Sequence, residues 1–267
     1  SLRGFLNFEE NRWFSIFSAK AFPSKYFIAP DSRHSQLLTI VPGRSGSELD
    51  VKNSLEKIIG GIDGRIFIST FASNVARLYS IAQSAAKHDR HVVLSGRGMH
   101  KIVNAAKSVG ILKGLPEFVD EEDAGYLPAE KTLILCTGSQ GEFRAALSKI
   151  ARDQHQHIVA ERGDTVIFSS KVIPGNESGI LSLQNLFAKK GIKIITGNDE
   201  FVHVSGHPCQ DELLEMFNLI KPNAIIPVHG EFRHLTANAN LAEANGIKKS
   251  LVIENGTIVK ISDKDIT

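Results

Sequence analysis

Residues 201–234 read FVHVSGHPCQDELLEMFNLIKPNAIIPVHGEFRH. This stretch indicates both the fold of the chain and the location of its candidate functional site. Apolar runs at 201–204 and 223–228 predict short buried strands, and the apolar spacing across residues 209–220 predicts a helix between them. Strands joined through a helix pair in parallel, so both would end at the same edge of a sheet. His203 and His207 lie at the first of these ends and His229 at the second. Open α/β sheets bind ligands beyond the carboxyl ends of their strands, so we expect the functional site there.

The same alternation extends upstream through most of the chain. Strands are predicted at residues 65–70, 91–95, 132–136, 165–168 and 193–195, with helices among them, including residues 142–152. Repeats of strand, tight turn and helix predict an α/β fold with a doubly wound, mostly parallel sheet. Near the end, Asn255-Gly256 predicts a hairpin between two strands of residues 250–261.

Residues 1–41 differ from the rest, because they are rich in aromatic residues that follow no clean period. They suit a segment that wraps onto another domain, the remnant of a truncated domain, or an irregular cap on the core. We therefore expect three parts: an atypical aromatic-rich N-terminal segment at 1–41, a main α/β domain at 42–200, and a part at 201–267 in which strands and helices return.

Composition favours a globular protein in a reducing compartment. With 42% hydrophobic residues the chain can bury a core, and a net charge of +2 is too small to attract nucleic acid by itself. Cys136 and Cys209 lie far apart without paired spacing, which is more typical of buried thiols than of metal ligands or a disulfide. The sequence shows neither an apolar run of membrane-spanning length nor a signal-peptide layout at its start. We expect a cytoplasmic protein that does not enter a membrane.

The histidines of residues 201–234 form the most specific candidate site. Alternation in an extended backbone would put His203, Ser205 and His207 on one side, and Gly206 would let a ligand approach the main chain. Such groups can bind phosphate or move a proton near neutral pH. A single histidine at a strand end is usually structural, but three polar groups in an apolar strand favour function. His229 suits a metal, although one imidazole does not make a zinc site.

Other polar turns give weaker signals. Residues 137–141, TGSQG, follow a predicted strand, so their N–H groups could hold a phosphate, yet a plain turn between strand and helix explains them better. Ser45 or Ser47 could cap the helix that follows residues 42–48. His155 and His157 lie in a polar stretch where solvent exposure explains them. The sequence lacks the P-loop and dinucleotide fingerprints and the H-x-H-x-D-H and H-E-x-x-H metal motifs.

The order of several motifs resembles bacterial ribonuclease J, a β-CASP nuclease of the metallo-β-lactamase superfamily. The motifs are PGRSGSE at 42–48, TFASNVAR at 70–77, GRGM at 96–99, CTGSQGE at 136–142, HVSGH at 203–207 and PVHGE at 227–231. The resemblance implies that residues 42–200 form a β-CASP domain and that residues 201–267 are returning strands and helices of a partial metallo-β-lactamase half. It also implies hydrolysis of RNA, as a 5′ exonuclease and endonuclease, at a two-zinc centre.

The resemblance assigns roles to particular residues. It implies that His203 assists at the scissile phosphate as a catalytic residue and that His229 reaches a zinc ion. Ser205, Gly206 and His207 would contact RNA phosphate. The channel that receives the RNA would be lined by Ser45, Ser47, Ser139 and Gln140. The partners implied are RNA with a 5′-monophosphate and a second copy in a homodimer.

The departures from the family pattern limit these expectations. The family's H-x-H-x-D-H element is absent, and residues 36–41 read QLLTIV where the family has Asp-Ser-Thr-Asn. We therefore expect an incomplete zinc site and a chain that is inactive alone because its zinc-binding N-terminal half is missing. The alternative is a non-catalytic β-CASP module that binds RNA or phosphate. A Rossmann-like binder of small molecules is a weaker alternative, since the dinucleotide fingerprint is absent.

Overall fold

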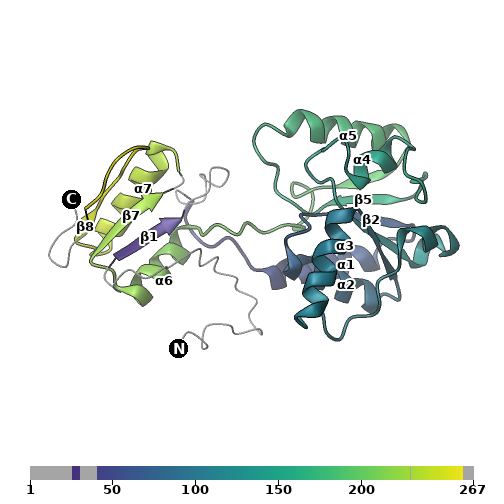
Figure 1. Ribbon diagram of the computed structural model, residues 1–267, viewed down its shortest axis with the longest axis horizontal. Helices are drawn as coiled ribbons and strands as arrows, with labels where there is room; N and C mark the ends of the chain where they lie inside the picture. Colours follow the sequence, from purple (N-terminus) through teal and green to yellow (C-terminus); the bar gives the residue numbers. More distant parts are fainter. Residues whose placement is uncertain (1–25, 31–40, 229, 261–267) are drawn as a thin grey trace. The chain divides into compact units, whose positions relative to one another are not determined.

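The computed structural model describes the backbone of residues 26–30 and all of residues 41–228 and 230–260. The described chain forms two compact units, each with its own sheet (Figure 1). Unit 1 contains residues 47–204, and unit 2 contains residues 26–30, 41–46, 205–228 and 230–260. Among the helices of the described residues, none combines the length and apolarity needed to span a membrane.

Unit 1 is built on a five-stranded parallel sheet. Its strands are β2 (Ile66–Ser69), β3 (His91–Ser95), β4 (Thr132–Cys136), β5 (Thr165–Phe168) and β6 (Lys193–Ile195), in the order β3-β4-β2-β5-β6. The last residue of β2, Ser69, pairs with Cys136 on one side and Phe168 on the other. Because all strands run the same way, their carboxyl ends form one edge, which we call the carboxyl edge.

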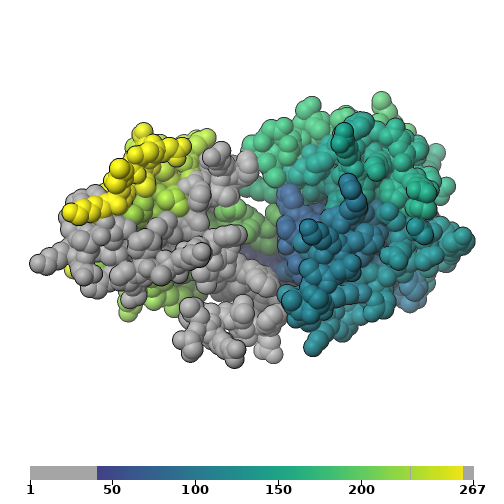
Figure 2. Space-filling model, viewed as in Figure 1, coloured from purple at the N-terminus to yellow at the C-terminus, as the bar shows by residue number. Residues whose placement is uncertain are grey.

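Helices cover both faces of this sheet. On one face lie α1 (Glu48–Gly60), α2 (Val75–Lys87) and α3 (Arg97–Ser108), and on the other lie α4 (Ala146–Ala151) and α5 (Glu177–Lys189) (Figure 1). Successive strand residues point to opposite faces, so Ile68 packs in the first core while Phe67 packs in the second. In the space-filling view, earlier residues in blue and later residues in green share the visible surface of unit 1 (Figure 2). The predicted doubly wound α/β fold is confirmed.

Unit 2 has a smaller parallel sheet in the order β1-β7-β8. These strands are β1 (Tyr26–Pro30), β7 (Ala224–Val228) and β8 (Lys249–Ser250). Helices α6 (Gln210–Ile220) and α7 (Phe232–Ala244) contribute Phe217 and Ala242 to a core around Ile225. The predicted hairpin is wrong: residues 255–256 form a turn, but residues 251–260 contain no strand, and β8 runs parallel to β7.

The strand predicted at residues 201–204 is also absent. The Val202 N–H donates to the Glu200 carbonyl at 2.8 Å, and the Val202 carbonyl accepts from side chains rather than from a neighbouring strand. Phe201 remains 42% exposed, so the run is not uniformly buried. Side-chain hydrogen bonds therefore replace the strand ladder in this segment. Helix α4 likewise starts at Ala146 rather than near residue 142, because the Glu142 carboxylate turns back to the Gln140 N–H at 3.0 Å.

Candidate functional site

A buried arginine organises the carboxyl edge of unit 1. Asn74 caps α2, and Arg77 follows in its first turn on the buried side, where its side chain is completely enclosed. Its Nε and Nη2 donate to the two carboxylate oxygens of Glu48, at 2.7 and 2.9 Å. Glu48 is the first residue of α1, and the preceding Ser47 caps that helix through the Asp50 N–H. A buried ion pair thus joins the first turns of α1 and α2.

The remaining donor of Arg77 reaches the chain that precedes His203. Arg77 Nη1 lies 3.1 Å from the Ser169 carbonyl, 2.7 Å from Ser169 Oγ and 3.0 Å from the Val202 carbonyl. Ser169 Oγ in turn donates to the Val202 carbonyl at 2.7 Å. Ser169 directly follows β5, and Thr70, which follows β2, donates to the Ser169 carbonyl at 3.0 Å. The peptide before His203 is therefore fixed to the strand ends.

His203 is held in its neutral form. Burial lowers the pKa of its imidazole to about 3, and the positive charges of Arg77 and Lys171 act in the same direction. Its Nδ1 is buried, and within the described part of the chain it has no hydrogen-bond partner. An unpaired buried ring nitrogen costs stability, so the place of His203 is better explained by a functional role than by packing.

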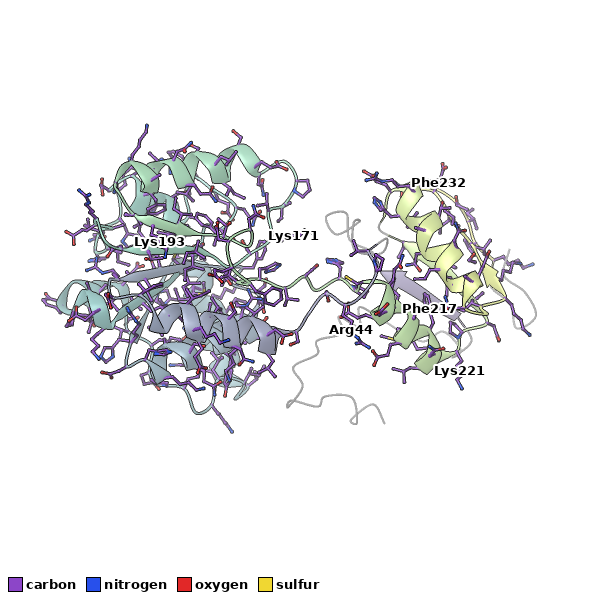
Figure 3. The ribbon with its side chains drawn as sticks, turned by 180° about the vertical axis from the view of Figure 1, so that it is seen from behind. Arg44, Lys171, Lys193, Phe217, Lys221 and Phe232 are labelled. Atoms are coloured by element: carbon purple, nitrogen blue, oxygen red, sulfur yellow. The ribbon has the colours of Figure 1, made fainter. Side chains whose placement is uncertain are left out.

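Lys171 supplies a positive charge beside this histidine. Within the described residues, no hydrogen bond or ion pair joins its ammonium to another group. Lys171 projects from the loop after β5, at the carboxyl edge. Lys193 is the first residue of β6, so it lies at the opposite edge, where the strands begin (Figure 3). An ammonium and a neutral imidazole with an unpaired nitrogen suit an anion such as phosphate.

Gln140 holds the Lys171 loop in place. Its Nε2 donates to the Lys171 carbonyl at 2.9 Å and to Ser170 Oγ at 3.3 Å, and its Oε1 accepts from the Ile173 N–H at 2.9 Å. Gln140 is 6% exposed and its neighbour Ser139 is 3% exposed. The structure thus gives Gln140 a bracing role, and direct contact of these two residues with RNA stays a prediction.

A glycine contact explains the close packing of residues 137–141. Gly141 has a φ of +76°, and a Cβ there would lie 2.4 Å from the Gly179 carbonyl carbon in α5. The turn and the helix therefore approach each other through backbone alone. Helix α4, which follows the turn, has only six residues.

Of the other predicted site residues, Ser45, Ser205, Gly206 and His207 belong to unit 2. Ser45 donates through both its N–H and its Oγ to the Glu212 carboxylate, at 3.1 and 2.9 Å, so it is tied to the start of α6 and does not cap α1. Ser205 Oγ accepts from the His207 N–H at 3.2 Å. A Cβ at Gly206 would meet no atom within 4 Å, so the backbone there is open. His229 lies outside the described residues.

His155 is another residue whose environment the sequence did not reveal. Its side chain is only 7% exposed, which corrects the expectation of solvent exposure. Its Nδ1 accepts from the His157 and Ile158 N–H groups, so the proton is on Nε2, which lies 3.0 Å from Ser95 Oγ. Ser95 donates to Glu121 at 2.9 Å, and burial lowers the pKa of His155. With its proton on Nε2, His155 cannot accept a proton from Ser95.

No metal cluster is built from the described residues. Among them, no group of three or more histidine, cysteine, aspartate or glutamate side chains is placed to hold a metal ion. Cys136 and Cys209 are both free and buried, and burial raises the pKa of Cys136 to about 12. The described part of the chain does not fit a zinc centre of its own, which would need at least three protein ligands.

Comparison with known proteins identifies the family. Ribonuclease J of Sinorhizobium meliloti is 44% identical over 220 residues, which cover 82% of this chain and 39% of the relative. Ribonuclease J 1 of Streptococcus pyogenes is 40% identical over 226 residues, covering 83% of this chain and 40% of the relative. Two family models also match: "Ribonuclease J, beta-CASP domain" at residues 63–187 and "Zn-dependent metallo-hydrolase RNA specificity domain" at 176–252. The chain belongs to the ribonuclease J family.

The ribonuclease J matches cover the residues of the site. Arg77, Ser139 and Gln140 lie in the part that matches the beta-CASP model, while His203 and His207 lie in the part that matches the RNA specificity model. The chain spans about two fifths of the length of these relatives. The sequence interpretation missed Arg77, although a charged residue beside the apolar stripe of Leu78 and Ile81 was a readable signal.

Proposed function

We propose that the protein processes RNA as a metal-dependent ribonuclease of the J type, cutting phosphodiester bonds hydrolytically as a 5′ exonuclease and endonuclease. This chain would supply the residues that hold the RNA phosphate. The observation that carries the proposal is the environment of His203, whose neutral imidazole has an unpaired Nδ1 at the carboxyl edge of a parallel sheet. His203 also lies within the residues that match the RNA specificity model, which supports RNA as the source of the phosphate.

The charges around His203 suggest how the phosphate is used. Burial is the main cause of the lowered pKa of His203, and the positive charges of Arg77 and Lys171 lower it further. A bound phosphate would offset those two charges, so the pKa would rise on binding. The imidazole would then donate a hydrogen bond, or a proton, to a phosphate oxygen as negative charge develops there. Lys171 would add a further contact to the same anion. We assign the catalytic role to His203 and phosphate contacts to Ser205, Gly206 and His207.

We further propose that zinc is the metal and that His229 is one of its ligands. The description of the matched hydrolase model, which names zinc dependence, supports this assignment, as does the position of His229 directly after β7. A bound zinc ion would supply an activated water and stabilise developing charge. Ser45, Ser47, Ser139 and Gln140 remain proposed channel residues. The family resemblance supports a homodimer, and the free cysteines support a reducing, cytoplasmic location.

RNA binding by the purified chain tests the proposal. Fluorescence anisotropy would compare 5′-monophosphorylated and 5′-hydroxyl oligoribonucleotides over a series of salt concentrations. We expect tighter binding of the phosphorylated RNA, weakened by salt and by His203→Gln. The matched control is His91→Gln, since His91 is an exposed histidine that begins β3, at the other edge. Equal binding by His203→Gln and the unmodified chain would reject the assignment.

Incubation with zinc or manganese separates the two candidate functions. Cleavage that is lost in His229→Ala would show that the chain acts as an enzyme. Binding without cleavage would support the second candidate, a non-catalytic module that binds RNA or phosphate. The charge of Lys171 and the unpaired Nδ1 of His203 support this candidate as well, because both groups could take part in binding a phosphate without a metal ion.

A further inference from the structure

Arg77 is bonded more extensively than helix stability requires. It is completely buried and makes five hydrogen bonds: two to Glu48, two to Ser169 and one to the Val202 carbonyl. Burying an ion pair costs desolvation energy, and an apolar pair of similar volume often stabilises a core as well. Arg77 lies on α2, whose neighbouring residues Leu78 and Ile81 are fully buried and apolar. The ion pair is therefore better explained by what it positions than by stability alone.

What the pair positions is the peptide that leads into His203. The Val202 carbonyl accepts from Arg77 Nη1 at 3.0 Å and from Ser169 Oγ at 2.7 Å. Two donors on one carbonyl fix the plane of the 202–203 peptide, which includes the His203 N and Cα atoms. Glu48 fixes the guanidinium from the other side through a bidentate contact. The orientation of the imidazole therefore depends on Arg77, Glu48 and Ser169.

We propose that Arg77, Glu48 and Ser169 form a brace whose role is to aim His203 at the RNA phosphate, an inference that rests on the proposed function. The three are positioning residues, because none is placed to touch RNA: Arg77 and Ser169 are fully buried and Glu48 is 6% exposed. The brace joins α1, α2 and the end of β5, so the geometry of the histidine is set by rigid elements rather than by its own loop.

Conservative variants separate positioning from stability. Ser169→Ala removes one donor to the Val202 carbonyl, and Arg77→Lys keeps the charge but loses the planar fork. Arg90→Lys is the matched control. Arg90 is also buried in unit 1, but it donates to the carbonyls of Ile62, Gly64 and Thr132 at the opposite edge of the sheet. All variants are made in the 267-residue chain.

The measurements are the RNA dissociation constant and the NMR titration of the His203 ring. We expect Ser169→Ala and Arg77→Lys to weaken binding of 5′-monophosphorylated RNA by about fivefold, the effect of one lost hydrogen bond. We also expect the pKa of His203 to rise toward its ordinary value, since the loosened segment admits water. Arg90→Lys should leave both quantities unchanged while lowering thermal stability. If Arg77→Lys does not fold, Ser169→Ala decides the question.

The outcomes also distinguish the brace from the proposed function. If the unmodified chain fails to bind RNA, the proposed function fails, and the His203 titration alone still tests whether the brace orients the ring. If the unmodified chain binds RNA while the brace variants keep its affinity and its His203 titration, the brace proposal is overturned and the function stands. Equal losses of RNA affinity in the brace variants and in Arg90→Lys would show a purely structural role and would also overturn it.

Discussion

Acidification should destabilise unit 1 through His203. An unfolded histidine has a pKa near 6.5, whereas burial lowers the pKa of folded His203 to about 3. The unfolded chain therefore binds more protons between these values, and stability must fall as the pH falls from about 6.5 toward 3. From pH 7 to pH 5, the linkage relation gives a loss of about 2 kcal/mol in the free energy of unfolding from this one residue.

The variant His203→Gln isolates this contribution, because glutamine is polar but does not titrate. Burial lowers the pKa of His155, which adds a loss of the same sign, and raises the pKa of Asp164, which acts oppositely. Both residues remain in the variant, so their effects cancel in the comparison. Urea denaturation at the two pH values would be followed by methyl NMR signals of Ile68 and Leu135, which lie in the core of unit 1.

The expected result is a pH-dependent loss that is about 2 kcal/mol larger in the unmodified chain than in His203→Gln. The same loss in both proteins would mean that folded His203 titrates like a free histidine. His203 would then not be held as a neutral imidazole in the folded chain, and its proposed role at the phosphate would lose its basis.

Three further predictions follow from individual contacts. Lys171→Gln should weaken RNA binding and reduce the salt dependence of log K by about one unit of slope, measured by anisotropy, whereas Lys193→Gln at the other edge should change neither. Gln140→Ala should lower the free energy of unfolding of unit 1 by about 1 kcal/mol in urea titrations, because the part-buried Lys171 carbonyl and Ile173 N–H lose their partner; an unchanged midpoint would contradict its bracing role. Phe67→Ala should cost about 3–5 kcal/mol in the same assay, since this fully buried ring fills the core between the sheet and α5; a loss below about 1 kcal/mol would show that the core closes around the gap.

The sequence predicted most of the sheet because its strands are stabilised by buried side chains. The strands β4, β5 and β6 have the predicted bounds, and each is a short apolar run of the kind that a doubly covered parallel sheet requires. The segment 201–204 has a similar composition, yet it does not form a strand. The Val202 carbonyl accepts hydrogen bonds from the side chains of Arg77 and Ser169 instead of from a neighbouring strand. Those partners lie 125 and 33 residues away, so no local pattern reveals them.

The sequence was enough to identify His203, but not the residues that surround it and hold it in place. His203 was identified from its motif, and the structure gives it an environment that suits an anion. Arg77, Ser169 and Lys171 were not identified, because their roles depend on hydrogen bonds and charges that arise only when the strand ends come together. His155 was misjudged for the same reason: its polar sequence neighbours conceal a buried contact with Ser95.

The most direct test of the central claim is an NMR titration of the chain with 5′-monophosphorylated RNA, observing the His203 ring. We expect the ring signals to shift on binding. Burial and the positive charges of Arg77 and Lys171 hold the pKa of His203 at about 3, and we expect it to rise because a phosphate offsets those two charges. Binding that leaves the His203 signals and pKa unchanged would show that RNA sits elsewhere and would contradict the account.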